Sequence, residues 1–497
     1  FEDCESLGGI IKIPETVEFI GRAVFAGCSS IETIIVDSNN SYYCSVEGAL
    51  YNNDCTLLLA WPGMQEGNAE VADTVVIVGA YSFKGCKKLR EIKFGEKVET
   101  IEEGAFSNCS INNMNIPNKV TVIEPWTFFE CISLKNVIIP ENIADIRQNA
   151  FMGCKELEEI KLPVGLEILG AGAFYNCCSL KEITIPEKIT SIGASTFDHC
   201  LKLKNIYIPE AVTNIGSAAF DDCQSLPEIT IPANVDQIGD SILSNCYSLK
   251  KVKIEGEIEN ITKDMFNGCN HLTDIEIPQS VTNIRENAFS GCESLKKIEI
   301  PNGVTTIKEG AFAGCKSIKA VNIPNTVTDI ERAVFKYCDD LESVIISQSV
   351  LEIADEAFSY CDNLSNVYFL GAAPNIENQV FYNTVANCYY PADNADWSND
   401  ILQNYGGTLT WQGWNKSGIS GVSQFWLLCN NGKLVLFGNG DMEENIFLDM
   451  PWKEWKLDIK EVIFSSEVSD IADKAFVGCK NLSTITFWGN PPNIAEN

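Results

Sequence analysis

Apolar positions recur along the chain with a period of about 23 residues. The unit reads V-T-x-I-x-x-x-A-F-x-x-C-x-x-L-x-x-I-x-I-P, and residues 281–301 are one complete copy. Its segments V-T-x-I and L-x-x-I-x-I alternate aliphatic and polar positions, which predicts two short strands, each with one buried face. Proline cannot donate to a ladder and so ends the second strand, and the Ala-Phe step predicts a tight, 3₁₀-like corner.

Cysteines mark the same register. A phenylalanine precedes nearly every one by three positions, and Leu243 is the one aliphatic substitute. Because no single unit can bury its apolar positions alone, the repeat predicts a stack of coils in which each coil packs on its neighbours. The cysteines in register are Cys28, Cys86, Cys109, Cys131, Cys154, Cys177, Cys200, Cys223, Cys246, Cys269, Cys292, Cys315, Cys338 and Cys361.

The pattern divides the chain into three parts. Residues 1–392 form a first array, with a hairpin insertion near 37–75 whose tip is Asn52-Asn53-Asp54. Residues 393–458 are rich in tryptophan and are interpreted as an exit and entry cap, with a second hairpin over 426–438. Residues 459–497 begin a second array, and the end of the chain aligns with the exit motif at 369–378, so we expect a piece cut at both ends.

Composition supports a folded chain, since 45% of residues are hydrophobic and 21% are charged. The net charge of −32 repels polyanions and anionic membrane surfaces, so nucleic acid is not an expected partner. No run of about 18 apolar residues occurs, so no membrane insertion is expected within the sequence. A signal peptide is not recognisable, and export has to be argued indirectly.

Catalytic chemistry finds little support. The two histidines, His199 and His271, flank the cysteine positions of their coils, where solvent-facing corner residues are favoured over a metal site with the cysteine column. Nucleotide-binding and serine-hydrolase motifs are absent. Pairs of Asp and Glu side chains at the spacing of a catalytic carboxylate pair are expected in a regular stack of strands, where they are simply neighbours on facing strands. We therefore expect no enzyme, no catalytic or metal-binding residues and no cofactor.

Two residue classes each allow two interpretations. The cysteine column is either an unbridged ladder of small buried side chains or a set of disulfides. The unbridged ladder is favoured, because side chains stacked in parallel seldom reach the Cβ–S–S–Cβ torsion that a disulfide requires. Local bridges among Cys44, Cys55, Cys177, Cys178, Cys388 and Cys429 stay open. Six tryptophans lie in the junction, and they either cover the exposed ends of the two arrays, which is the favoured interpretation, or stack on carbohydrate. They are Trp397, Trp411, Trp414, Trp426, Trp452 and Trp455.

The unit with A-F-x-x-C and I-x-I-P resembles the BspA-like, or Treponema-type, leucine-rich repeats of bacterial surface proteins, over roughly 1–392 and 459–497. The junction is similar to spacers that this family has in anaerobic Firmicutes. The resemblance implies a β-rich, right-handed leucine-rich repeat solenoid at the surface of a bacterium, with a role in attachment. The similarity of the spacers implies that this bacterium is an anaerobe. It transfers no catalytic residues.

Each L-x-x-I-x-I segment offers two outward residues to the concave sheet. Charged pairs there are interpreted as cross-strand neighbours, whereas apolar members are candidate anchors for a protein partner from host matrix or another cell surface. The alternative is a carbohydrate-binding or spacer region of a larger secreted protein. The candidate partner-binding residues are Ile138, Tyr207, Ile345 and Tyr368.

Overall fold

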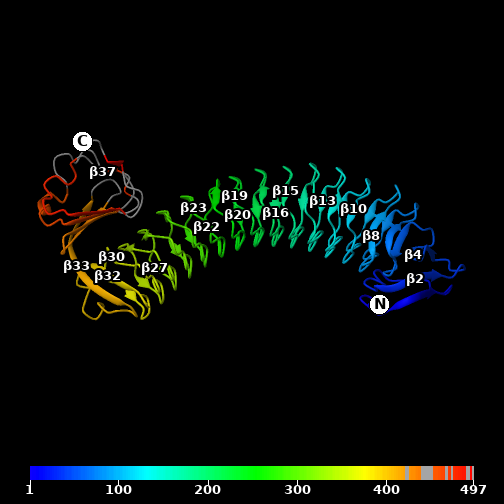
Figure 1. Cartoon of the computed structure of the whole chain (residues 1–497), viewed down its shortest axis with the longest axis horizontal. Coiled ribbons are helices and arrows are strands. Elements are labelled where there is room, and N and C mark those ends of the chain that lie inside the picture. Colours follow the sequence, from blue (N-terminus) through cyan, green and yellow to red (C-terminus); the bar gives the residue numbers. More distant parts are fainter. Residues whose placement is uncertain are drawn as a thin grey trace. The chain divides into compact units, whose positions relative to one another are not determined.

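The computed structural model describes residues 1–419, 425–437, 451–464, 468, 470–471, 474–487 and 493–494. It is a β-solenoid of about 20 turns of ~23 residues, which confirms the predicted repeat fold (Figure 1). Within the described ranges the one helical element is the 3₁₀ helix η2, Lys453–Trp455. The chain forms two compact units, residues 1–258 with 264–271 and residues 259–263 with 272–497.

Each regular coil of the first unit contributes one strand to each of two columns, as the two apolar segments predict. Strands pair in parallel with a register of one repeat, so that Ile123 in β11 faces Ile146 in β13. The V-T-x-I column contains β7 Ile77–Val78, β9 Thr100–Ile101, β11 Val122–Ile123, β13 Asp145–Ile146, β14 Ile168–Leu169, β16 Ser191–Ile192, β18 Asn214–Ile215 and β20 Gln237–Ile238. The L-x-x-I-x-I column contains β1 Gly8–Ile13, β2 Ser30–Val36, β6 Gly67–Glu70, β8 Leu89–Lys93, β10 Asn113–Asn115, β12 Asn136–Ile138, β15 Glu182–Thr184, β17 Asn205–Tyr207, β19 Glu228–Ile231 and β21 Lys251–Ile254.

The insertion consists of β3 Tyr43–Val46, β4 Ala49–Asn52 and β5 Leu57–Ala60, which are antiparallel neighbours. The hairpin predicted around Asn53 connects β4 to β5. A second hairpin, not predicted, turns through Glu47 and Gly48, both with positive φ, as a two-residue turn between twisted strands requires. Because β5 then pairs in parallel with β7, the insertion joins the stack without ending it.

The corner between the two strands of a coil is a series of β-turns. Around Phe106, the Cys109 N–H donates to the Phe106 carbonyl at 3.1 Å, which is the i→i−3 bond of the predicted 3₁₀-like corner. The Phe106 N–H donates instead to Thr127 of the next coil, at 2.9 Å. Left-handed residues, Gly104 and Asn108, flank Phe106 at two positions on either side. They interrupt a continuous 3₁₀ helix and free alternate N–H groups to join neighbouring coils.

Phenylalanine rings form a stacked column inside the corners. The rings of Phe151 and Phe174 lie 5.4 Å apart and within 3° of parallel. Where the repeat is irregular, a tryptophan takes the same place: Trp61 stacks on Phe83 at 5.2 Å, and Trp452 stacks on Phe476 at 5.6 Å. Since successive rings are in contact over long runs of coils, the column couples neighbouring coils.

All 21 cysteines are free, as expected for an unbridged ladder. The ladder is more than apolar filling, because most of its thiols point at a backbone carbonyl of the preceding coil. Cys200 Sγ donates to the Phe174 carbonyl at 3.3 Å, and Cys154 Sγ donates to the Phe128 carbonyl at 3.2 Å. Where this contact forms, the column carries a hydrogen bond from one coil to the coil before it.

The second unit contains the same two columns and a nine-stranded sheet through the junction, in the order β26-β28-β30-β32-β33-β34-β35-β36-β38. Its V-T-x-I column contains β22 Asn260–Ile261, β24 Asn283–Ile284, β25 Thr306–Ile307, β27 Asp329–Ile330, β29 Glu352–Ile353 and β31 Asn375–Ile376. The other strands are β23 Asp274–Ile275, β26 Ala320–Asn322, β28 Ser343–Ile346, β30 Asn366–Phe369, β32 Val385–Pro391, β33 Thr408–Ile419, β34 Phe425–Cys429, β35 Lys433–Phe437, β36 Glu461–Phe464, β37 Asp470–Ile471, β38 Thr484–Phe487 and β39 Asn493–Ile494.

The hairpin predicted over 426–438 is formed by β34 and β35, with Gly432 at positive φ in its turn. Junction tryptophans pack into the fold: Trp397 and Trp411 lie 5.7 Å apart beside Phe369, and Trp426 lies 5.7 Å from Trp455. These rings contact other aromatic side chains of the second unit. Residues 420–424 and 438–450 of the cap, and 488–492 and 495–497 of the second exit motif, lie outside the described residues.

Candidate binding groove

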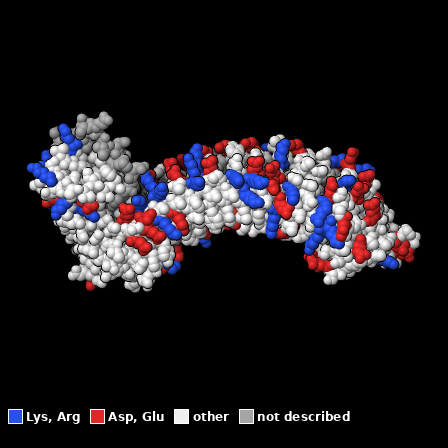
Figure 2. All heavy atoms as spheres, in the orientation of Figure 1, with Lys and Arg blue, Asp and Glu red and all other residues white. Residues whose placement is uncertain are grey.

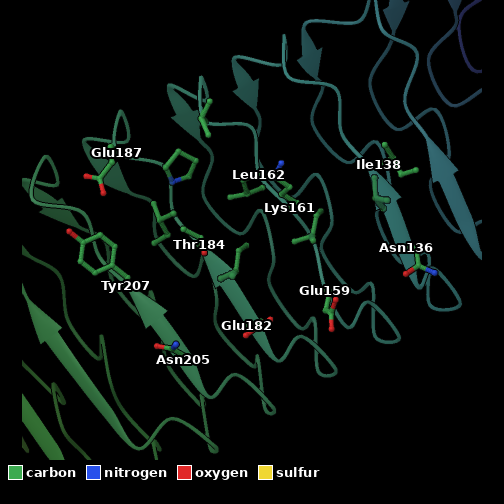
Figure 3. A pocket seen from close by; sticks show the side chains of 16 residues that line it. Asn136, Ile138, Glu159, Lys161, Leu162, Glu182, Thr184, Glu187, Asn205 and Tyr207 are labelled. Carbon is green, nitrogen blue, oxygen red and sulfur yellow. The ribbon is translucent and has the colours of Figure 1, made fainter.

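A groove of about 890 Å³ crosses four consecutive coils of the first unit, on the outward face of the L-x-x-I-x-I column (Figure 3). Its walls come from β12, the extended segment 159–164, β15 and β17. The segment 159–164 adds only one isolated bridge, between Glu159 and Glu182, to the ladder. The groove therefore lies where the sheet is interrupted between β12 and β15.

Strand alternation divides the side chains between floor and rim. Val137, Ile160 and Ile183 point inward and are buried, so they fix the backbone from below. The outward residues form two rows, as Figure 3 shows. Asn136, Glu159, Glu182 and Asn205 make the first row, and Ile138, Lys161, Thr184 and Tyr207 make the second.

Three large apolar side chains of the groove are exposed to solvent. The exposed fractions are 64% for Ile138, 51% for Tyr207 and 77% for Val164. Isolated apolar residues are common on protein surfaces, whereas these three line one concavity. The prediction that Ile138 and Tyr207 are exposed on this face is confirmed, and the structure places both in the same groove.

The first row contains two glutamates that form no salt bridge with a described residue, although Glu159 lies in the field of Lys181, the cation that pairs with Glu158. Glu159 and Glu182 face each other in register, and neither has an ion-pair partner in the described part of the chain. By contrast, Glu70 and Lys93, which face each other in β6 and β8, form an ion pair at 3.2 Å. Among the described residues that line the groove, the one cation is Lys161, which lies 3.4 Å from Glu141 outside it.

The second row lies in the same negative field. The carboxylate of Glu187 raises the pKa of the Tyr207 phenol, with smaller contributions from burial and from Glu210 and Glu255. Acidic and basic residues are interspersed over the faces of the coils that Figure 2 shows. The groove combines an anionic rim with exposed apolar side chains.

The prediction that Ile345 and Tyr368 are exposed anchors is wrong. Their exposed fractions are 1% and 0%, and both belong to a cluster with Tyr389, Leu427 and Val435. The outward faces of β28, β30 and β32 pack against residues of β33 to β36, which bury the positions that are open in regular coils. Ile345 and Tyr368 therefore stabilise the second unit and cannot receive a partner.

Sequence reasoning missed Val164 and Glu187, which follow the prolines that end their strands. A signal was present, because the residue after this proline is polar in most coils and a large aliphatic residue only at Val164. Glu187 has no such signal, since glutamate also follows the proline in neighbouring coils.

The histidines lie at corners, as predicted, but only one is fully exposed. His199 Nδ1 lies 2.5 Å from Asp198 Oδ1 and Nε2 lies 3.4 Å from Asp222 Oδ2. His271 is exposed, with Nδ1 2.7 Å from the Tyr247 carbonyl.

Within the described ranges, His, Cys, Asp and Glu form no group of three that could hold a metal ion. The same ranges contain no helix long and apolar enough to cross a membrane.

Two parallel strand columns, stacked phenylalanine corners and a coil of about 23 residues define a leucine-rich repeat solenoid. A family model described as BspA type leucine-rich repeat region (6 copies) matches residues 1–55, 66–177, 144–273, 259–388 and 454–497. The chain belongs to this BspA-type leucine-rich repeat family.

The chain is similar to solved structures of leucine-rich repeat proteins. A leucine-rich repeat protein from Bacteroides ovatus is 22% identical, with a TM-score of 0.51, and the match covers 81% of this chain and 91% of that one. A leucine-rich cell surface protein from Faecalibacterium prausnitzii is 23% identical, with a TM-score of 0.46 and coverage of 74% and 94%. No curated protein matches the chain.

Proposed function

We propose that the chain is a non-catalytic scaffold at a bacterial cell surface and binds a protein ligand in the groove between β12 and β17. The observation that carries this proposal is the exposure of Ile138, Val164 and Tyr207 along one concavity. Interface energy concentrates in a few large side chains of this kind, surrounded by polar neighbours that exclude water.

The location rests on the repeat and on the thiols. BspA-like repeats resemble those of bacterial surface proteins, whose attachment role implies partners from host matrix or from other cells. A column of free, buried cysteines suits a protein that an anaerobic bacterium exports without forming disulfides. An adhesin is the finer proposal within this class.

The test uses a double variant of the anchors, Ile138→Ser with Tyr207→Ser, and a matched control, Ile168→Ser with Tyr247→Ser. The control residues belong to the same unit, are exposed at 54% and 40%, and lie outside the groove. Immobilised chain is screened by biolayer interferometry against host-matrix and bacterial surface proteins, and in parallel on a glycan array.

For a protein ligand found in this screen, we expect the anchor variant to weaken binding at least tenfold and the control to change it less than about twofold. Equal affinity of the wild type and the anchor variant would refute the groove as the binding site. Binding to glycans without any protein ligand would favour the carbohydrate alternative, and failure on both panels would favour a spacer.

A further inference from the structure

The first row of the groove contains two like charges that face each other without a cation between them. Glu159 and Glu182 are bridge partners in adjacent coils, and parallel strands lie about 4.8 Å apart. Like charges directly opposite each other on a sheet are unfavourable. A ligand that brings a cation to this pair relieves the repulsion. An ion pair between facing residues of this column does form elsewhere, between Glu70 and Lys93 at 3.2 Å.

The second row offers apolar contact two positions further along the strands than the first row. Ile138 lies two residues beyond Asn136 on β12, and Tyr207 lies two residues beyond Asn205 on β17, so the anchors flank the glutamates. A ligand that satisfies both rows needs a positive charge beside a bulky apolar side chain.

Building on the proposed function, we propose that the groove recognises a peptide segment of its partner protein that carries an arginine next to an aromatic or large aliphatic residue. A guanidinium has five N–H donors in a planar fork and can bridge two carboxylates at once. The apolar side chain then covers Ile138, Tyr207 or Val164 and excludes water from the ion pair.

Charge argues against other occupants. The net charge of −32 opposes a polyanion and opposes a second copy of this chain in an anionic groove. A bare divalent cation also fits poorly, because no group of three candidate ligands exists in the part of the chain that the structure describes.

A peptide selection tests this proposal even while the partner protein is unidentified. A phage-displayed library of random dodecapeptides is selected on the full chain, after depletion on the variant with Ile138→Ser and Tyr207→Ser. Peptides that survive depletion bind the groove. We expect these peptides to be enriched in arginine adjacent to Phe, Tyr, Trp, Leu or Ile relative to the unselected library.

Synthetic peptides from this selection are then measured by isothermal titration calorimetry. We expect Glu159→Gln with Glu182→Gln to weaken binding about tenfold, since two exposed ion pairs are lost. The control pair Glu15→Gln with Glu18→Gln changes the net charge equally, away from the groove, and should change affinity less than about twofold. Replacing the peptide arginine by lysine should weaken binding severalfold, because lysine lacks the planar fork.

Groove-dependent peptides without arginine enrichment, or with equal affinity for the Glu159→Gln/Glu182→Gln variant and the wild type, would overturn the arginine inference and leave the groove as a binding site. Equal weakening by the two glutamate pairs would also overturn it, because the effect would then come from net charge alone. Absence of any groove-dependent peptide would refute a peptide ligand, and failure of the protein panel as well would refute the proposed function.

Discussion

Thr384 Oγ1 donates a hydrogen bond of 2.8 Å to the carbonyl oxygen of Phe358. One coil earlier, Cys361 Sγ makes the same contact with the Phe335 carbonyl at 3.2 Å. Thr384 thus takes the position of Cys361 in the next coil, where the sequence loses its cysteine. The column requires a small side chain with a hydrogen-bond donor, and a hydroxyl can replace the thiol.

Cys223 provides a direct test of this requirement, because its Sγ donates to the Phe197 carbonyl at 3.3 Å. We expect Cys223→Ala to destabilise the neighbouring coils by about 1–2 kcal/mol, through the lost hydrogen bond and a small cavity. Cys223→Ser keeps a donor and should cost less. Hydrogen exchange measured by mass spectrometry over 195–250 reports the local effect. The opposite order of the two variants would show that the thiol acts only as apolar filling.

Thiol reactivity should separate the ladder from the remaining cysteines. Burial raises the pKa of Cys269 to about 12 and that of Cys361 to about 12, and the thiolate is the reactive form. At about pH 8 we therefore expect iodoacetamide to label exposed Cys4 and half-buried Cys178 in the folded protein, and the ladder only after denaturation. Peptide mass spectrometry reads out each site, and rapid native labelling of Cys269 would contradict its burial.

Stability of the coils around His199 should fall as pH rises. Burial lowers the pKa of His199, but the hydrogen bond to Asp198 and the charges of Asp222 and Asp221 raise it more, so the net shift is upward. The folded state thus holds this proton more tightly than the unfolded state. The stabilisation is complete below the unfolded pKa of about 6.5 and is lost as pH rises through the folded value.

Burial also raises the pKa of Asp198 and of Asp221, so these groups shift stability in the same direction, at lower pH. We expect hydrogen-exchange protection of 195–223, corrected for intrinsic rates, to decrease between about pH 6 and pH 8. The decrease should disappear in His199→Gln and persist in His271→Gln, whose ring is exposed. An unchanged pH dependence in His199→Gln would assign the effect to other groups.

Tyr368 should behave as a core residue of the second unit. Its ring stacks on Tyr389 at 4.9 Å, beneath the cluster that includes Leu427 and Val435. We expect Tyr368→Ala to cost about 3 kcal/mol, whereas Tyr207→Ala in the open groove should cost less than about 0.5 kcal/mol. Guanidinium denaturation followed by tryptophan fluorescence compares the two, and a neutral Tyr368→Ala would contradict its burial.

Part of the site was predictable from the sequence, and the two wrong anchor residues have one physical cause. Strand alternation assigns Ile138 and Tyr207 outward, and both are exposed. The same alternation assigns Ile345 and Tyr368 to the outward face of their strands. Both side chains do lie on that face, but other strands cover it and bury them. A periodic pattern states which face of a strand a residue occupies, but not whether another part of the chain covers that face.

The sequence by itself determined the coil, its two strands and its stacked phenylalanine and cysteine columns, because these depend on contacts between neighbours that repeat once in every coil. Tertiary structure decided the features that depend on contacts which do not repeat from coil to coil. It brought Val164 and Glu187 into one groove with Ile138 and Tyr207, and left Glu159 and Glu182 facing each other without a cation. It also buried Tyr368 against residues of β34 and β35, which are strands of the junction, and no local period can specify this contact.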